Sequence, residues 1–358
     1  MDFTFTEEQQ MMASAFGALA EELCAPAALR AAFEAGGGAD ATRWQRLAEL
    51  GLAGVLGPES AGGMGLTLTD FILIAESAGR AALPDTLLEH AGIGVPLLAE
   101  FAADARVDAV LRDAIAGRAR LAVSHPANPF MLGAGAATHL LVMTDCEVHL
   151  LRREQVVLEP HRSVDALRSL SRLATPLDPA TCLARGALAA QASARAFERG
   201  AVLAAAECVG LCERMLSMAV AYAGERTQFG KKIGSYQALK HQLANVQVKL
   251  EFCRPVLYAA ATRAGALDGR SLLSVSHAKL AAVEAADLAA RTALQVHGAM
   301  GYSWEVDLHF FMKRAWALSG AWGDRSLHMR RVQAQLFTHH LAIGPEQMFV
   351  LHQAPGTA

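Results

Sequence analysis

The sequence is poor in aromatic residues and in blocks of like charge. Only 6% of its 358 residues are aromatic, and lysine and arginine form no basic run. The formal net charge is −3, so the composition gives no support to nucleic-acid binding. Hydrophobic residues, mainly alanine and leucine, make up 53% of the chain. Such a composition favours helices around a large core, and the length predicts two or three domains.

Features of secreted and membrane proteins are also missing. The first ten residues are acidic and polar, whereas a secretion signal needs a basic start and then an apolar run. No apolar stretch reaches about 18 residues, so no membrane span is expected. The six cysteines form no CxxC pair, and Cys208 and Cys212 are interpreted as small buried hydrophobes. The sequence therefore predicts a cytoplasmic protein with reduced thiols and no metal.

Three regions of different pattern follow one another along the chain. Residues 1–118 carry apolar side chains at spacings of three and four, which predicts helices. Residues 119–189 instead show short β-type runs between turn residues, at 121–124, 139–143, 148–151 and 156–158. Over residues 190–358 the helical period returns with a stripe typical of a bundle, at Leu239, Leu243, Val246 and Leu250. The predicted fold class is α+β: an N-terminal helical domain, a small middle β domain and a C-terminal four-helix bundle.

Local signals place some boundaries in the first region. Thr6 has the character of a helix cap, and a second helix is predicted from about Ala41 to Leu52. The loop over residues 57–65 is rich in glycine, but it lacks a lysine and follows no strand, so it is not interpreted as a phosphate loop. The next helix is predicted to begin near Thr67, with Asp70 in its first turn.

The segment from Arg226 to Gly234, Arg-Thr-Gln-Phe-Gly-Lys-Lys-Ile-Gly, is the most informative part of the sequence. An arginine fork matches paired phosphate oxygens, and glycines at 230 and 234 permit a turn whose amides approach a ligand closely. Gln228 and Gln237 add neutral hydrogen-bonding groups. A glycine after a helix is by itself an ordinary end signal. The segment therefore indicates a phosphate-bearing cofactor only in combination with other evidence.

That evidence is the run Gln295-Val-His-Gly-Ala-Met-Gly-Tyr302. Together with the Arg226 segment and the order helical, β, helical, it makes almost the whole chain resemble the acyl-CoA dehydrogenase family. The resemblance implies that both motifs bind FAD, with the bend after residue 295 meeting the guanidinium of Arg226 across a subunit boundary. It also implies an acyl-CoA substrate and an electron-transfer flavoprotein as acceptor. The cofactor-binding residues implied are Ser124, Arg226, Gln228, Phe229, Tyr236, Gln237, Gln295, Val296, Gly298 and Ala299.

The chain departs from the family pattern around the flavin. Ala299 stands where the family has a second glycine, and its methyl group narrows the approach of backbone to cofactor. His297 matches a residue of the cofactor loop, so it is not interpreted as a general acid. In the β region Ser124 could still donate a hydrogen bond to the flavin, but the tryptophan-bearing strand of the family is missing.

The departure with the largest chemical consequence concerns the base. Dehydrogenation in the family needs a glutamate to remove the α-proton while the flavin accepts a hydride. Alignment with the family puts Trp322 at one position used for this glutamate and Gly200 at the other. The weak candidates that remain are Asp324, which also suits a helix N-terminus, and Glu207, whose apolar setting would raise its pKa if it were buried. Glu198 is interpreted as part of a solvated helix start.

These absences resemble a branch of the family that acts in bacterial steroid and bile-acid side-chain degradation. Members of that branch assemble as α2β2 heterotetramers in which one subunit type lacks the glutamate, and residues 322–331 look like its C-terminal segment. The hypothesis is that this chain is such a subunit and acts with a second acyl-CoA dehydrogenase subunit. Two alternatives stay open: a self-sufficient homotetramer with a displaced base, and a non-catalytic scaffold without flavin.

Overall fold

The computed structural model describes residues 4–342 and 344. The N-terminal region is helical, as predicted. Thr6 and Gln9 form a capping box at the first helix, and Thr67 and Asp70 form another at α4. The predicted helix from Ala41 ends at Glu49 rather than Leu52, because Gly51 adopts a left-handed conformation with φ +74°. The helices are α1 (Glu7–Leu23), α2 (Pro26–Glu34), α3 (Ala41–Glu49), α4 (Leu68–Ala81), α5 (Leu87–Glu89), α6 (Val95–Ala99) and α7 (Ala105–Ile115).

Two small sheets follow. The strands are β1 (Leu121–Ser124), β2 (Met131–Leu132), β3 (His139–Met143), β4 (Glu147–Arg152), β5 (Leu158–His161), β6 (Leu170–Leu173) and β7 (Cys182–Arg185). One sheet has the order β1-β3-β4-β7, with β1 parallel to β3, and the other has the order β2-β6-β5. The run predicted at 156–158 is displaced, because Val156 and Val157 precede β5.

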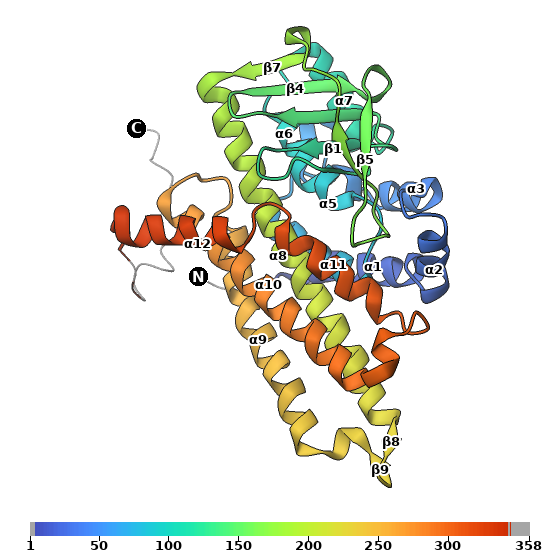
Figure 1. Cartoon of the computed structure of the whole chain (residues 1–358). Helices are drawn as coiled ribbons and strands as arrows, with labels where there is room; N and C mark the ends of the chain where they lie inside the picture. The colour runs from blue at the N-terminus through green and yellow to red at the C-terminus, as the bar shows by residue number, and fades with distance from the viewer. Residues whose placement is uncertain (1–3, 343, 345–358) are drawn as a thin grey trace.

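Alternation along β1 and β3 explains why this region forms a separate layer. Val123 and Leu141 belong to the main core, whereas their neighbours Ala122, Leu140 and Val142 belong to a smaller core between the two sheets. Successive side chains of a strand point to opposite faces, so each strand contributes to both cores. The β layer is thereby fixed at one end of the helical body (Figure 1).

The C-terminal region is the predicted four-helix bundle, formed by α8 (Gly186–Glu225), α9 (Gln237–Ala261), α10 (Gly269–His297) and α11 (Leu308–Gly320). The helix α8 starts before the predicted residue 190 and spans the length of the molecule (Figure 1). A hairpin of β8 (Thr227–Gln228) and β9 (Lys231–Lys232) joins α8 to α9 at the end remote from the β layer. The short helix α12 (Arg325–Gln333) packs on α10.

Glycines let the N-terminal region pack closely on this bundle. A side chain at Gly210 of α8 would overlap the backbone of Glu76 in α4, and one at Gly79 of α4 would overlap the backbone of Glu207. The two helices therefore cross with their backbones in contact, which places Glu207 directly behind α4. Within the described residues, no helix is long and apolar enough to cross a membrane.

Candidate functional site

A cavity of about 350 Å³ lies where the three regions meet. The middle of α8 forms one wall, and the loops between β1 and β2, before β6 and after α11 form others. The remaining wall comes from α5 and from the π-helical turn His90–Gly94, which connects α5 to α6. Most of the lining is apolar, and it includes Gly200 and Trp322, the two positions at which the resemblance led us to expect the glutamate.

Trp322 occupies the space that a side chain at Gly200 would need. A Cβ atom added to Gly200 would overlap the indole ring. Trp322 is buried and adopts a left-handed φ of +54°, which is uncommon for a bulky residue. The backbone N–H of Trp322 donates to Asn128 Oδ1 at 3.3 Å, and its backbone carbonyl lies 3.0 Å from His328 Nε2. A side chain at position 200 and this indole therefore cannot both fit.

Lys279 of α10 holds the turn that carries Trp322. Its ammonium group donates to the carbonyl of Leu318 at 2.7 Å and also lies 3.5 Å from the carbonyl of Gly323. Burial lowers the pKa of this lysine to about 8. These carbonyls lie on either side of the tryptophan, so Lys279 fixes the turn rather than serving the cavity directly.

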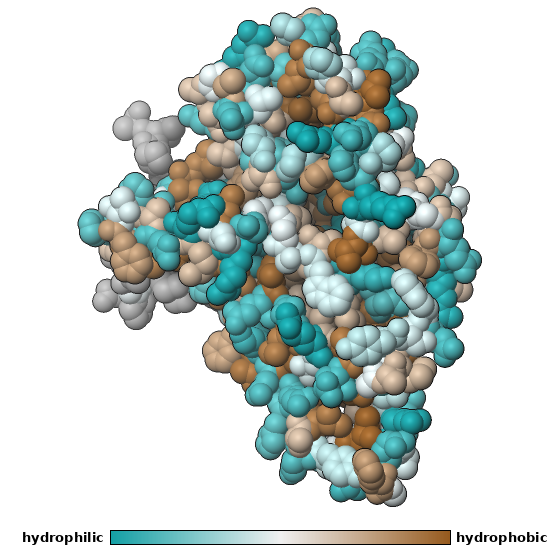
Figure 2. All heavy atoms as spheres, viewed as in Figure 1, coloured by the Kyte–Doolittle hydropathy of each residue, from teal (hydrophilic) through white to brown (hydrophobic). Residues whose placement is uncertain are grey.

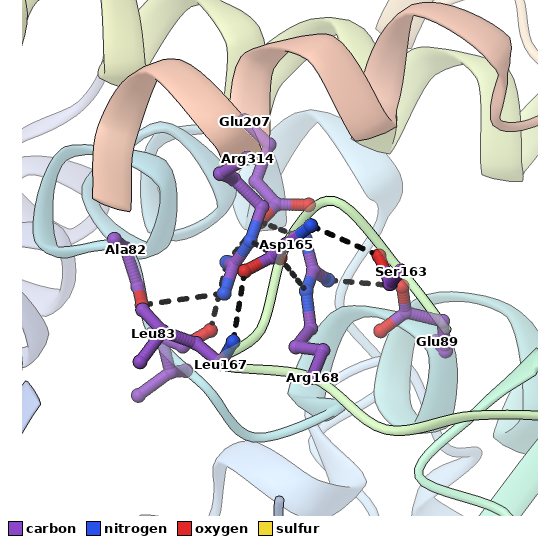
Figure 3. A network of polar contacts seen from close by, with 9 residues as sticks. All are labelled: Ala82, Leu83, Glu89, Ser163, Asp165, Leu167, Arg168, Glu207 and Arg314. Carbon is purple, nitrogen blue, oxygen red and sulfur yellow. Dashed lines mark hydrogen bonds and ion pairs between the residues drawn. The ribbon is translucent and has the colours of Figure 1, made fainter. Parts of the chain in front are cut away.

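Two arginines and three carboxylates form a buried network at one end of the cavity (Figure 3). Glu207 accepts from Arg168 at 2.8 Å and from Arg314 at 3.0 Å. Asp165 accepts from the same two arginines, and Glu89 lies 3.4 Å from Arg168. Arg314 also donates to the carbonyl of Leu83, at 2.9 Å, which joins α11 to the end of α4. Glu207 is thus held by two cations, and its carboxylate is engaged rather than free to act as a base.

The two other carboxylates of this network differ in proton affinity. Burial acts to raise the pKa of Asp165, but Arg314 and Arg168 outweigh it, and the pKa lies below its usual value. Burial raises the pKa of Glu89, with Arg168 only partly opposing it. Glu89 Oε2 is buried and has no hydrogen-bond partner among the described residues. Among the described carboxylate oxygens of this network, Glu89 Oε2 is the one that is fully buried without a hydrogen bond, whereas both arginines bind Glu207 through Oε1.

The remaining candidates for a base lie away from the cavity. Asp324 is the N-cap of α12, where it accepts from the N–H of Leu327 at 2.8 Å. Glu198 is fully buried in the middle of α8 and accepts from Ser271 Oγ at 2.9 Å and from the N–H of Gly265 at 2.7 Å. The interpretation of Glu198 as a solvated helix start was wrong. Its carboxylate instead fixes the connection between α9 and α10.

A second hollow, an open groove of about 540 Å³, lies near the hairpin end of the bundle. Both sequence motifs line it, and both belong to this one chain. The two motifs thus meet within this chain, whereas the resemblance implied a meeting across a subunit boundary. Of the residues implied by the resemblance, those that line the groove are Arg226, Gln228, Phe229, Tyr236, Gln295, Val296, Gly298 and Ala299.

Two of the implied residues do not line this groove. Gln237 begins α9 between Tyr236 and Ala238, which line the groove, but is not itself part of the lining. Ser124 is buried at the end of β1, where its hydroxyl lies 3.3 Å from the carbonyl of Pro129. His297 lines the groove but is buried, stacks on Tyr222 with ring centroids 4.4 Å apart and has its Nδ1 2.7 Å from the carbonyl of Ala293. Its ring is a structural part of the groove floor.

The groove offers the groups that a dinucleotide requires. The guanidinium of Arg226 is exposed and makes no ion pair with the residues that the structure describes. The amides of Gln228 and Gln295 are exposed beside it. Gly298 has φ +59°, and an added Cβ would meet no atom within 4 Å, so its backbone is open to a ligand. A cation for phosphate, amides for hydrogen bonds and a bare backbone fit the diphosphate part of FAD.

Comparison with known proteins settles the family. Residues 6–118 match the family model for the acyl-CoA dehydrogenase N-terminal domain, and residues 185–337 match that for the C-terminal domain. The chain belongs to the acyl-CoA dehydrogenase family. It is 32% identical over 310 residues to acyl-CoA dehydrogenase IpdE2 of Mycobacterium tuberculosis, covering 86% of this chain and 91% of that one.

Solved structures share the fold of this family member. The ChsE4–ChsE5 complex of Mycobacterium tuberculosis contains a chain with a TM-score of 0.81 at 23% identity, covering 94% of this chain and 99% of that one. A steroid acyl-CoA dehydrogenase, Tcur3481–Tcur3483, gives a TM-score of 0.80 at 23% identity, with the same coverage. Membership in the family makes the chain an acyl-CoA dehydrogenase-type oxidoreductase with FAD as its cofactor.

Most of the buried network could not be predicted from the sequence. Glu89, Asp165, Arg168 and Arg314 come from three separate segments and converge only in the folded chain. Asp165 and Arg168 are three residues apart, a spacing too common to be noticed in a loop. The only sequence signal was that Asp165 and Arg168 are oppositely charged residues close together in the chain.

Proposed function

We propose that this acyl-CoA dehydrogenase is the base-deficient subunit of a heteromeric enzyme that acts on a steroid-derived acyl-CoA. The observation that carries the proposal is the contact between Trp322 and Gly200: the indole occupies the space of a side chain at position 200, and position 322 itself carries no carboxylate. An indole cannot accept a proton from carbon. A second acyl-CoA dehydrogenase subunit therefore supplies the base.

In this proposal the chain contributes its groove, which binds FAD, to the heteromeric enzyme. Arg226 binds phosphate oxygens of FAD, and Gln228 and Gln295 orient the cofactor through neutral hydrogen bonds. FAD, when bound, supplies the hydride acceptor. The rim carries exposed apolar side chains, with Phe229 90% and Met300 39% exposed. Large exposed apolar side chains beside a ligand groove favour a protein partner that covers them.

The steroid assignment draws on relatives. One structural neighbour is described as a steroid acyl-CoA dehydrogenase and another as a complex of two different chains, ChsE4 and ChsE5. An electron-transfer flavoprotein is the proposed electron acceptor, as the family resemblance implies. The identity of the ring system or side chain is left open.

The test is co-expression of this chain with a second acyl-CoA dehydrogenase chain that retains the glutamate. We expect a yellow complex that contains both chains, oxidises acyl-CoA and loses bound flavin absorbance when Arg226 is replaced by alanine. Arg118→Ala, which removes an exposed arginine of the N-terminal region, is the matched control and should leave the flavin content unchanged. A colourless product, or chains that purify separately, would count against the proposal.

The two alternatives have distinct signatures in the same preparation. A self-sufficient homotetramer would contain only this chain, and its flavin would be bleached by acyl-CoA. A flavin-free scaffold would associate with the second chain yet give the same flavin content with and without Arg226. The exposed cation and bare glycine backbone of the groove favour cofactor binding over a scaffold, which has no need of either.

A further inference from the structure

The cavity has two chemically different ends. Gly200 and Trp322 mark the end at which the family places its base, and Glu207 marks the other end on the same helix. These positions on α8 are seven residues apart, which corresponds to about 10 Å along a helix. The polar network behind Glu207 is therefore remote from the place where a thioester would react.

The stretch between the two ends is apolar. Its lining includes Leu88, Ile93, Phe130, Leu170, Leu203 and Ala204. Such walls suit a hydrocarbon body and give no polar partner along its length. A ligand that fills the cavity consequently meets polar groups again only near Glu89 and Arg168.

Glu89 is the group at that end that still needs a partner. Its Oε2 is buried and unpartnered among the described residues, while its other oxygen lies 3.4 Å from Arg168. A buried acceptor without a hydrogen bond costs about 1–3 kcal/mol. Asp165 and Glu207, by contrast, are each held by two arginines. An incoming hydrogen-bond donor would satisfy Glu89 without disturbing the rest of the network.

We propose that this cavity binds, without dehydrogenating, an acyl-CoA whose apolar body carries a hydroxyl group at its far end, and that Glu89 accepts the hydrogen bond from that hydroxyl. This inference rests on the proposed function in one respect, the lack of a base at positions 200 and 322. The site is then a binding site of the base-deficient subunit, separate from the reaction centre that the partner completes.

The charge of the network selects a neutral hydroxyl over other polar groups. Arg168 and Arg314 are already engaged by Asp165 and Glu207, so a carboxylate on the ligand would face Glu89 without a free cation to offset the repulsion. An ammonium group has three N–H donors, but Glu89 Oε2 is the one fully buried carboxylate oxygen of the described network that lacks a partner, and the adjoining walls are apolar, so the desolvation of the ammonium group would be poorly offset. A hydroxyl brings one donor to one acceptor.

The experiment measures binding of two matched thioesters to the purified chain by calorimetry. The probes are 3-cyclohexylpropanoyl-CoA and 3-(4-hydroxycyclohexyl)propanoyl-CoA. We expect the hydroxylated probe to bind at least tenfold more tightly to the unmodified chain, and Glu89→Leu to abolish or reverse that preference. Glu89→Gln keeps an acceptor oxygen and should retain part of the preference for the hydroxylated probe. Both probes should be recovered unchanged after binding.

Controls separate the proposal from loss of folding. Thermal unfolding of Glu89→Leu shows whether the fold persists, since Arg168 keeps Asp165 and Glu207 as partners. Ala204→Leu fills the middle of the cavity without touching the network and should weaken binding of both probes.

Equal affinity for the two probes in the unmodified chain, or no binding of either, would overturn the inference. Neither result needs FAD or the partner, so the outcome is independent of the co-expression test. Dehydrogenation of a probe by this chain alone would instead overturn the base-deficient function itself.

Discussion

Among single residues, the pairing of Gly200 with Trp322 makes a prediction about coupled stability. Gly200→Ala places a methyl group against the indole, and overpacking of a buried site costs about 1–3 kcal/mol. In a chain that also carries Trp322→Ala the same methyl group has space, so its cost should largely disappear. Urea unfolding of the two single variants and the double variant measures this coupling. Strictly additive effects would show that the two residues do not share the space.

Glu207 provides a second prediction, because its two arginine partners are buried. Glu207→Gln leaves Arg168 and Arg314 with too little negative charge, and breaking a buried ion pair from one side costs about 3–5 kcal/mol. Denaturant unfolding should show a loss of this size. Glu251→Gln, at a half-exposed carboxylate of α9, should change the unfolding free energy by less than about 1 kcal/mol. A neutral effect of Glu207→Gln would remove the structural role argued for this network.

The packing of α4 against α9 carries a pH dependence. Glu76 of α4 is buried beside Arg254 of α9, and burial raises its pKa from 4.5 to about 7, with Arg254 partly opposing. The folded state therefore holds more protons than the unfolded state between these values, so stability falls as pH rises through this window. The loss amounts to at most about 3 kcal/mol.

The matched variant for this effect is Glu76→Gln, which cannot ionise. Its unfolding free energy should exceed that of the unmodified chain at about pH 7.5 and should differ little at about pH 4.5, because the glutamate is then largely protonated in the folded state. Glu154→Gln, at an exposed position, should show no such divergence. If the two pH profiles of Glu76→Gln and the unmodified chain run parallel, Glu76 does not titrate as argued.

Elements differed in how far the sequence could predict them. The strands at 121–124 and 139–143 were predicted with their observed bounds, because apolar β-branched and aliphatic runs stand there between turn residues. The strands β2, β6 and β7 were not predicted, since they are only two to four residues long and are stabilised by pairing with distant segments. The same reason explains the buried network. Its members lie on α5, the loop before β6, α8 and α11, and no local pattern encodes how these segments meet.

The surface of the molecule as a whole indicates where a second chain would associate. Apolar side chains are exposed on the bundle, including Val248 and Phe252, which are one turn apart on α9 and 53% and 74% exposed. Figure 2 shows further apolar atoms among polar ones toward the hairpin end of the bundle. A pair of large exposed apolar side chains on one helix face is favourable to bury and unfavourable to leave in water.

Phe252→Glu tests this surface in the co-expressed complex. A carboxylate buried against a partner costs far more than an exposed one, so the variant should weaken association at least tenfold, as measured by sedimentation of the purified chains. Unfolding of the isolated chain should be unchanged, because Phe252 is already exposed there. Val157→Glu alters a similarly exposed apolar residue in the β layer, 67% exposed, and controls for a general effect of added charge. If both variants assemble as well as the unmodified chain, the partner does not bind at Phe252.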